Sequence, residues 1–307
     1  MRILVTGGAG FIGSNIVDKL IELGYEVAVI DNISTGKLEK LNSKAKFYKL
    51  DITDADSMVE AFVDFRPEVC IHHAAQVDVQ KSIKEPMFDL NVNIAGTLNI
   101  LEACIKSDVR KIIYASSAAA YGEPEYLPID ELHKTKPISL YGISKHTPEH
   151  HIEVYGKLHG LNYTILRYSN AYGIRQEYEG EGGVIAIFLN KIIQNETPII
   201  YGDGKQTRDF IYVKDIVEAN IAAINKGDNE IINISNNNNI SINELVDVLA
   251  KICDKEIHPS YKDARGGDII HSYMDNKKAD NLLGWKPKYS LEEGLKETLD
   301  YYVSIAR

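Results

Sequence analysis

The chain has 307 residues, 44% of them hydrophobic and 25% charged, and a formal net charge of −10. These proportions are typical of a soluble globular protein, and no apolar run approaches the roughly 20 residues of a membrane span. The acidic balance, without a block of lysines or arginines, argues against nucleic-acid binding. Three isolated cysteines and a chain that starts directly in a strand predict a cytoplasmic protein with no disulfide framework, metal site or signal peptide.

Strand and helix patterns alternate through the first half of the chain. Apolar strands that stand between helices indicate a parallel sheet covered on both faces, so we predict an α/β fold with a Rossmann-type, doubly wound parallel sheet. The expected strands are 3–6, 26–30, 46–50, 69–71, 111–115 and 163–166, and the expected helices are 11–23, 54–65, 87–106 and 140–158.

The second half of the chain is less regular. Ser241 and Glu244 have the spacing of a capping box, which opens a helix that runs to about residue 253. We expect the strands at 208–213 and 230–234 to return to the sheet. The other expected helices are 183–195, 215–223, 278–283 and 291–302.

A glycine-rich turn joins the first strand to the first helix. Gly7, Gly10 and Gly13 follow a Gly-x-x-Gly-x-x-Gly spacing, in which glycine permits a tight turn and brings the backbone close to a pyrophosphate at the helix N-terminus. Asp31 directly follows the second strand, where a carboxylate accepts hydrogen bonds from ribose hydroxyls and repels a 2′-phosphate. The strand before the turn, the helix after it and this acid favour an NAD site over an ordinary glycine-rich turn.

Further cofactor contacts are expected where the next strands end. Asp51 and Ile52 close the third strand, where an adenine ring could be held. Ala74, Ala75 and Gln76 follow the fourth strand, where small residues would let the cofactor pass.

Two domains follow from this reading. We predict an NAD-binding domain formed by residues 1–168 and approximately 208–235. Residues of approximately 169–207 and 236–307 would form a smaller, discontinuous lobe over the carboxyl ends of the strands.

Tyr141 and Lys145 lie four positions apart in an expected helix, so the phenol and the ammonium share one face. A phenol is a poor base at neutral pH, and a fixed cation beside it lowers its pKa. Ser117 ends an apolar strand upstream and could orient a substrate. The same spacing recurs at 201–205 and 273–277 without this context, where surface or packing roles are favoured. The set around Tyr141 indicates proton transfer at a carbinol or carbonyl beside a hydride carrier.

Motifs of one known family run through nearly the whole chain. They are 7–13, 31–32, 73–75, 116–117, 121–122, 141–145, 167–173, 202–204, 208–209 and 265–268. In these residues the chain resembles the extended short-chain dehydrogenase/reductases and, within them, the UDP-glucose 4-epimerase (UDP-galactose 4-epimerase) family. The resemblance is specific for an enzyme of nucleotide sugars and less specific for which sugar.

The resemblance implies roles for the catalytic set. Tyr141 would be the general base that takes the proton from the sugar 4-hydroxyl while hydride passes to NAD. Lys145 would lower the pKa of Tyr141 and hold the nicotinamide ribose, and Ser117 would hydrogen-bond the sugar 4-oxygen. The 4-keto sugar would then turn over, held by its UDP tail, before hydride returns to the opposite face.

The resemblance also implies substrate and cofactor contacts. Arg208 and Arg265 match positions that hold the diphosphate, because a guanidinium gives paired, charge-assisted hydrogen bonds. Asp268 matches the uridine-ribose position, Asn170 a substrate contact, and Ser272 a position that gates the pocket around the C2 substituent. The implied cofactor contacts include Phe11, Ile12, Asn32, Ser34, Gly36, Asn93, Ser116 and Tyr168.

The sequence restricts the type of reaction more closely than the identity of the sugar. Ala118 and Ala119 stand where similar dehydratases carry an acid pair and similar decarboxylases a glutamate, so elimination lacks its catalyst and epimerisation remains. Because Ser272 is small, UDP-N-acetylglucosamine could react besides UDP-glucose. A UDP-glucuronate 4-epimerase stays open, since Ser169 or Arg175 could meet a carboxylate. The non-enzymatic alternative is a sensor that binds NAD and a nucleotide sugar.

The resemblance implies one further partner, a second copy of the chain. Helices 87–106 and 140–158 correspond to those that pair as a four-helix bundle in family homodimers. The expected partners are therefore a UDP-sugar substrate and a homodimeric copy, with neither nucleic acid nor membrane.

Overall fold

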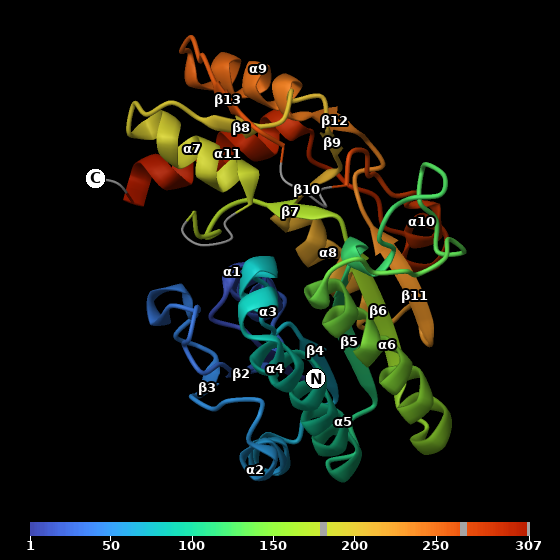
Figure 1. The fold of residues 1–307 in the computed structure, drawn as a ribbon. Helices are drawn as coiled ribbons and strands as arrows, with labels where there is room; N and C mark the ends of the chain where they lie inside the picture. Colours follow the sequence, from blue (N-terminus) through green and yellow to red (C-terminus); the bar gives the residue numbers. More distant parts are fainter. Residues whose placement is uncertain (179–182, 265–268, 306–307) are drawn as a thin grey trace.

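The computed structural model describes residues 1–178, 183–264 and 269–305. Its centre is a seven-stranded sheet in the order β11-β6-β5-β4-β1-β2-β3, in which all neighbours are parallel (Figure 1). The order reverses between β1 and β4, so the loops beyond their carboxyl ends diverge and leave a crevice. The strands are β1 (Arg2–Thr6), β2 (Glu26–Ile30), β3 (Lys46–Tyr48), β4 (Val69–His72), β5 (Lys111–Ser117), β6 (Asn162–Tyr168) and β11 (Glu230–Ile234).

Helices bury both faces of the sheet, because alternate strand residues point to opposite faces. Ile3 and Val5 of β1 pack on the face covered by α1, α8 and α10, whereas Leu4 packs on the face covered by α2, α5 and α6. None of the described helices is long and apolar enough to cross a bilayer. The helices of these layers are α1 (Phe11–Glu22), α2 (Ala55–Phe65), α3 (Val79–Lys84), α4 (Pro86–Leu90), α5 (Gly96–Lys106), α6 (Leu140–His159), α8 (Val213–Ala223) and α10 (Lys277–Leu283).

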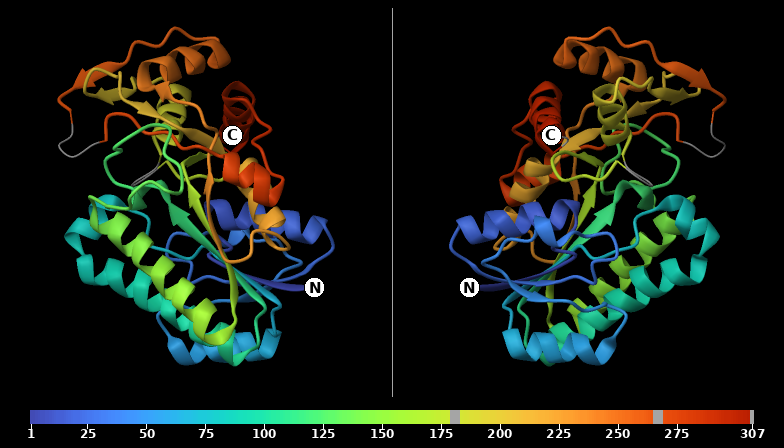
Figure 2. Two further views of the ribbon diagram at one scale, coloured as in Figure 1. Left: turned by 90° about the vertical axis from the view of Figure 1, so that its right-hand side faces the viewer. Right: turned by 90° about the vertical axis from the view of Figure 1, so that its left-hand side faces the viewer.

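A separate apolar cluster forms the core of a smaller lobe. Leu189, Leu245 and Leu295 come from three different helices of this lobe, and Phe11 and Ile12 at the start of α1 pack against it. The lobe therefore lies beyond the carboxyl ends of the strands, as Figure 2 shows. Its elements are α7 (Val184–Ile193), α9 (Ile242–Cys253), α11 (Leu291–Ile305), β7 (Asn170–Tyr172), β8 (Ile199–Tyr201), β9 (Thr207–Arg208), β10 (Phe210–Tyr212), β12 (Ile240–Ser241) and β13 (Ser260–Lys262).

The predicted α/β fold with a doubly wound parallel sheet is confirmed, and two element predictions are wrong in detail. The expected strand 208–213 does not return to the sheet: β9 pairs with β12 and β10 pairs with β7, and only β11 joins β6. The break falls at Asp209, whose buried carboxylate accepts hydrogen bonds from the backbone N–H groups of Asn236 and Met274 instead of facing a strand neighbour.

The expected helix 87–106 is likewise interrupted. It consists of α4, a wider π turn η2 (Asn91–Ala95) and α5. The π turn carries Asn93, whose buried side chain bonds to Gln76, Asp89 and Ser144. A π turn is a common way to place such a polar side chain without ending the helix.

Candidate active site

The glycine turn between β1 and α1 is closed tightly. The Gly7 N–H donates to the carbonyl of Ile30, and the Gly10 N–H donates to the carbonyl of Gly7 at 3.1 Å. Gly7 has φ +69°, and a Cβ on Gly13 would lie 2.2 Å from the Gly7 carbonyl oxygen. Side chains are therefore excluded at both ends of the turn, and the first N–H groups of α1 lie at the carboxyl edge of the sheet.

A cavity of about 620 Å³ opens at this edge, over the crevice between β1 and β4. Most of the predicted cofactor and catalytic residues line it, although they come from six different strand ends and from α1 and α6. They are Gly7, Gly10, Phe11, Ile12, Gly13, Asp31, Asn32, Ser34, Asp51, Ile52, Ala74, Ala75, Ser116, Tyr141, Lys145 and Tyr168.

Asp31 is held on the glycine turn by backbone donors. Its Oδ2 accepts from the N–H of Ala9 at 3.0 Å and its Oδ1 accepts from the N–H of Ile33 at 2.8 Å. The side chain is buried and lines the cavity. A fixed carboxylate at this point repels a phosphate and keeps free lone pairs for hydroxyl donors.

Three predicted cofactor residues do not line the cavity. Gln76 and Asn93 exchange hydrogen bonds between backbone and side chain at 2.8 and 2.9 Å, and both side chains bond to Asp89. Asn93 also donates to the hydroxyl of Ser144 on α6. Gly36 packs behind the wall, because a Cβ there would lie 3.0 Å from Asp31 Oδ1. The structure thus gives Gln76 and Asn93 a supporting position behind the cavity wall.

Ser117, Tyr141 and Lys145 meet where β5 ends and α6 begins. Ser139 caps α6 by accepting from the N–H of Gly142 at 3.0 Å, which places Tyr141 in the first turn. The Ser117 hydroxyl hydrogen-bonds to the phenol of Tyr141. The Lys145 ammonium lies one turn further on, 4.5 Å from the centre of the Tyr114 ring.

Burial dominates the electrostatics of this pair. It raises the pKa of Tyr141 above its usual range, against our expectation that Lys145 would lower it, although the hydrogen bond from Ser117 works in the opposite direction. Burial also lowers the pKa of Lys145 to about 7, while the negative charges of Glu149 and Asp89 raise it. The protein alone thus holds a neutral phenol beside an ammonium that is close to losing its proton at neutral pH.

His73 belongs to the cavity and was not among the predicted site residues. Its Nε2 lies 3.1 Å from the Tyr168 hydroxyl, which also accepts from the amide of Asn220. Burial lowers the pKa of His73 to about 3, so the ring is neutral. Its Nδ1 is buried and has no hydrogen-bond partner among the described residues. The resemblance motif at 73–75 was the only sequence signal for this residue.

One wall of the cavity comes from residues far apart in the chain, which sequence reasoning missed. Glu177 accepts hydrogen bonds from Lys40 and forms an ion pair with Lys37, whose Nζ lies 3.1 Å from Oε2. Lys40 also donates to the carbonyl of Arg175 at 2.9 Å. These contacts join the loop after β2 to the segment after β7. No local pattern marks them, because Lys40 and Glu177 are separated by 137 positions.

Three predicted substrate residues of the second half of the chain, Asn170, Arg208 and Ser272, do not line this cavity. Asn170 opens β7, which pairs with β10, and the backbone N–H of Asn170 donates to the carbonyl of Asp209. Arg208 ends β9, and a bridge between Thr207 and His271 brings Ser272 beside this strand. The structure therefore brings Asn170, Arg208 and Ser272 onto adjacent segments of the lobe. The predictions for Arg265 and Asp268 lie outside the described residues.

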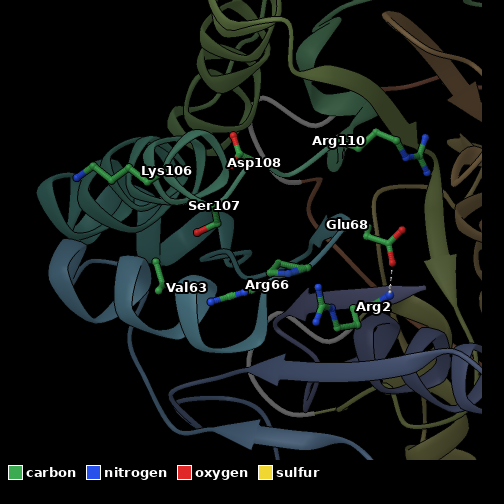
Figure 3. Close-up of a pocket in the computed structure, with 9 residues that line it drawn as sticks. Arg2, Val63, Arg66, Glu68, Lys106, Ser107, Asp108 and Arg110 are labelled. Carbon is green, nitrogen blue, oxygen red and sulfur yellow. Dashed lines mark hydrogen bonds between the residues drawn. The ribbon is translucent and has the colours of Figure 1, made fainter.

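A second hollow, of about 430 Å³, lies at the opposite, amino edge of the sheet (Figure 3). Arg2 begins β1, and Glu68 and Arg110 directly precede β4 and β5. The backbone N–H of Arg2 donates to Glu68, and the side chains of Lys106 and Arg110 point away from each other. Most of these charged side chains are exposed, so solvent screens them, and none of the predicted site residues lies there.

Comparison with known proteins decides the family. A family model described as the NAD dependent epimerase/dehydratase family matches residues 3–235. The chain belongs to this family. Within it, the chain is similar to the UDP-glucose 4-epimerase of Mycolicibacterium smegmatis, with 37% identity over 309 residues that cover 98% of each protein.

Two solved structures of epimerases are similar over the whole chain. UDP-glucose 4-epimerase from Thermotoga maritima, crystallised with UDP-glucose, is 47% identical, has a TM-score of 0.98 and covers 100% of both chains. UDP-N-acetylglucosamine 4-epimerase from Methanobrevibacter ruminantium M1, in complex with UDP-N-acetylmuramic acid, is 37% identical with a TM-score of 0.94 and covers 99% and 98%.

The residues that line the cavity fit NAD, the cofactor in the description of the family. A glycine turn without side chains stands at the N-terminus of α1, and a fixed carboxylate follows β2. The buried Nδ1 of His73 lacks a partner within the described chain, so a polar group of a bound molecule could satisfy it.

Proposed function

We propose that this chain catalyses the NAD-dependent 4-epimerisation of a UDP-hexose, with UDP-glucose and UDP-galactose as the first choice. One observation carries the proposal: Tyr141 and Lys145 line the same cavity as the glycine turn and Asp31, and Ser117 lies beside Tyr141 where β5 ends. The whole-chain similarity to a UDP-glucose 4-epimerase crystallised with UDP-glucose supports the choice of sugar.

NAD, when bound, accepts a hydride from C4 of the sugar and returns it. Gly7, Gly10 and Gly13 let the backbone approach its pyrophosphate, and Asp31 accepts from its adenosine ribose. Lys145 would donate to the nicotinamide ribose, and Tyr168 and His73 line the same cavity.

The protein's own residues manage the proton. Ser117 hydrogen-bonds Tyr141 and shares the sugar 4-oxygen with it, so the reacting hydroxyl is oriented before the proton leaves. Tyr141 takes this proton and later returns it to the 4-oxygen, after the sugar has turned over and its opposite face has received the hydride. Because burial raises the pKa of Tyr141, the phenolate needs positive charge beside it, and the ammonium of Lys145 is one source.

The rest of the sugar nucleotide would be held by the lobe. Arg208, together with the predicted Arg265, would hold the diphosphate, Asp268 the uridine ribose, and Asn170 the substrate. A substrate that is held only through its UDP part leaves its sugar ring free to turn over. Ala118 and Ala119 form the short turn η3 after Ser117 and offer no acid, so water elimination has no catalyst there.

The C2 substituent is the less determined part of the substrate. Ser272 has a small side chain at the position that gates this pocket in the resemblance, which leaves room for an N-acetyl group. The similar enzyme from Methanobrevibacter ruminantium M1 is named for UDP-N-acetylglucosamine, which favours testing that sugar as the second candidate. UDP-glucuronate is the third, because Arg175 or Ser169 could meet its carboxylate.

Turnover of UDP-glucose, UDP-N-acetylglucosamine and UDP-glucuronate by the purified chain tests the proposal, together with the NAD released on denaturation. We expect UDP-glucose to be interconverted with UDP-galactose, and NAD to be present before any is added. Turnover of the uronate alone would overturn the choice of substrate. Bound NAD without turnover of any sugar would favour the sensor alternative.

We also propose a cytoplasmic homodimer formed through the helical region 87–106 and α6. Several large apolar side chains there are exposed on the surface of the described chain. Size-exclusion chromatography with light scattering would give a dimer mass, and a charged substitution at Ile143 would give a monomer. The side chains concerned are Met87, Phe88, Leu90, Leu140, Ile143, Val154 and Leu158.

A further inference from the structure

Glu149 is a buried carboxylate on α6 that does not line the cavity. It is 1% exposed, and its oxygens accept from Arg167 Nε at 3.0 Å and Arg167 Nη2 at 2.5 Å. The Ser116 hydroxyl donates to Oε1 at 2.5 Å, and His146 Nδ1 lies 2.9 Å from Oε2. Four hydrogen bonds to one buried carboxylate restrict the rotation of Glu149 and of each partner side chain.

Each partner of Glu149 either lines the catalytic cavity or is the chain neighbour of a residue that does. Ser116 precedes Ser117 at the end of β5, and Arg167 precedes Tyr168 at the end of β6. His146 follows Lys145 on α6. One side chain thus joins the three elements that carry the proton-transfer residues and the tyrosine at the cavity wall.

Glu149 also lies one helical turn from Lys145, so the two side chains share a face of α6. The groups that face Glu149 are Arg167 from β6, Ser116 and the Tyr114 phenol from β5, and His146 and Lys145 from α6 itself. Burial opposes its charge, but Arg167 and His146 outweigh burial and lower the pKa of Glu149 to about 2. Its negative charge is therefore present at all working pH values.

The carboxylates of Glu149 and Asp89 act on the pKa of Lys145 in the same direction. Glu149 heads the groups that raise the pKa of Lys145, ahead of Asp89, against a burial that lowers it. Arg167 is engaged with Glu149 on one side, and its guanidinium lies 4.6 Å from the centre of the Tyr121 ring on the other. Removing Glu149 therefore removes the counter-charge with the largest effect on a buried ammonium.

We propose that Glu149 is a positioning residue for the reaction, which ties α6 to the ends of β5 and β6 and holds Lys145 as an ammonium. The inference rests on the proposed epimerase function for its kinetic part only. The hydrogen bond from Ser116 gives Glu149 a role beyond stability of the fold, because it fixes the end of β5, where Ser117 follows, against the helix that carries Tyr141 and Lys145.

Glu149→Gln keeps the size and one acceptor but removes the charge. We expect kcat to fall by about 10- to 100-fold with KM for UDP-glucose unchanged, since misplacement acts on the reacting geometry. In a plot of kcat/KM against pH, the alkaline limb should move to lower pH by about one unit, because Lys145 loses its proton at a lower pH. The matched control is Glu153→Gln, one turn further along α6 and partly exposed, which should leave kcat and the profile unchanged. A Glu149→Gln profile equal to that of the control overturns the proposal.

Glu149→Gln leaves Arg167 buried without its partner and could lower stability by itself. The double variant Glu149→Gln with Arg167→Met removes both charges and should recover the unfolding midpoint. The shifted alkaline limb should persist in it, because Arg167 is not among the groups that set the pKa of Lys145. Recovery of the wild-type profile together with the midpoint would show that Glu149 supports the fold alone.

A measurement without substrate or added cofactor separates this inference from the proposed function. In the wild type, unfolding stability should rise with pH above about 7 as the buried Lys145 becomes neutral. In Glu149→Gln this rise should begin at lower pH. If the wild type turns over no UDP-sugar, the proposed function fails while this comparison still decides the electrostatic role of Glu149. An unchanged onset would contradict that role.

Discussion

The two edges of the central sheet are built by the same strands and differ in almost every property. At the carboxyl edge, Asp31 and Lys145 are buried around a cavity of about 620 Å³. At the amino edge, Arg66, Lys106 and Arg110 are exposed around a hollow of about 430 Å³. Both edges carry charge, but the charged residues named at the cavity are buried, whereas those named at the hollow are exposed.

The difference has a physical cause in the fold. Parallel strands joined by helices direct the N-terminus of α1 toward the carboxyl edge, and the lobe covers that edge. Removal from water shifts pKa values and strengthens each hydrogen bond, whereas exposed ions are screened. Substitutions around the carboxyl-edge cavity should therefore have large effects, and those around the amino-edge hollow small ones. The variants below test this difference.

The largest effect is expected from Tyr141→Phe, which removes the hydroxyl that accepts the sugar proton. Turnover should fall by roughly 10³-fold, within the usual range for a general acid–base group. The NAD content should stay unchanged, because the glycine turn and Asp31 are intact. Activity assays and the absorbance of released NAD measure both quantities. Retained turnover would contradict the assignment of the base.

Lys145→Met should raise stability while it lowers turnover. The pKa of Lys145 in the folded chain, about 7, lies below its ordinary value of 10.5, so the folded state penalises the charged form. This cost is fully present below pH 7 and is lost as pH rises toward 10.5. At pH 7 the variant should be more stable by about 2–4 kcal/mol, after the loss of the contact with Tyr114. Denaturant unfolding at pH 7 and pH 10.5 checks that the gain shrinks at high pH.

Gly13→Ala tests the glycine turn itself. The added methyl group would lie 2.2 Å from the Gly7 carbonyl oxygen, so the turn must open, at a cost of about 1–3 kcal/mol and with loss of bound NAD. Gly24→Ala is the matched control near the amino edge, where φ is +80° but no atom lies within 4 Å. It should cost about 1 kcal/mol through φ alone and keep NAD. Equal NAD loss in both variants would remove the contrast between the edges.

Arg66→Gln should have the smallest effect. Its side chain is exposed beside the amino-edge hollow, and surface substitutions of this kind change stability by within about 0.5 kcal/mol. The unfolding free energy, kcat and NAD content should all match those of the unaltered chain. A clear change in kcat would show that the amino edge communicates with the reaction.

The sequence predicted residues of the carboxyl edge correctly where the signal lies within a short segment of the chain. The glycine spacing, Asp31 after a strand, and Tyr141 with Lys145 on one helix face each need fewer than ten neighbouring residues to be read. It missed His73 as a cavity residue, as well as the contacts of Lys37 and Lys40 with Glu177. It also extended the strand at 208–213 through Asp209, whose partners lie in two other segments. In each case the deciding partner is remote in the chain.

By itself the sequence determined the doubly wound sheet and the chemical types of the reacting groups, because periodicity and glycine spacing act through neighbours along the chain. The family came from the resemblance of its motifs to known proteins, which comparison confirmed. The tertiary structure alone decided their environment. Burial, which raises the pKa of Tyr141 and lowers that of Lys145, depends on what packs around them. The carboxylate of Glu149 meets Ser116 and Arg167 only once three elements are assembled. Desolvation and the effect of opposite charges depend on all the groups that surround a side chain in the folded protein. Short patterns along the chain do not specify these groups.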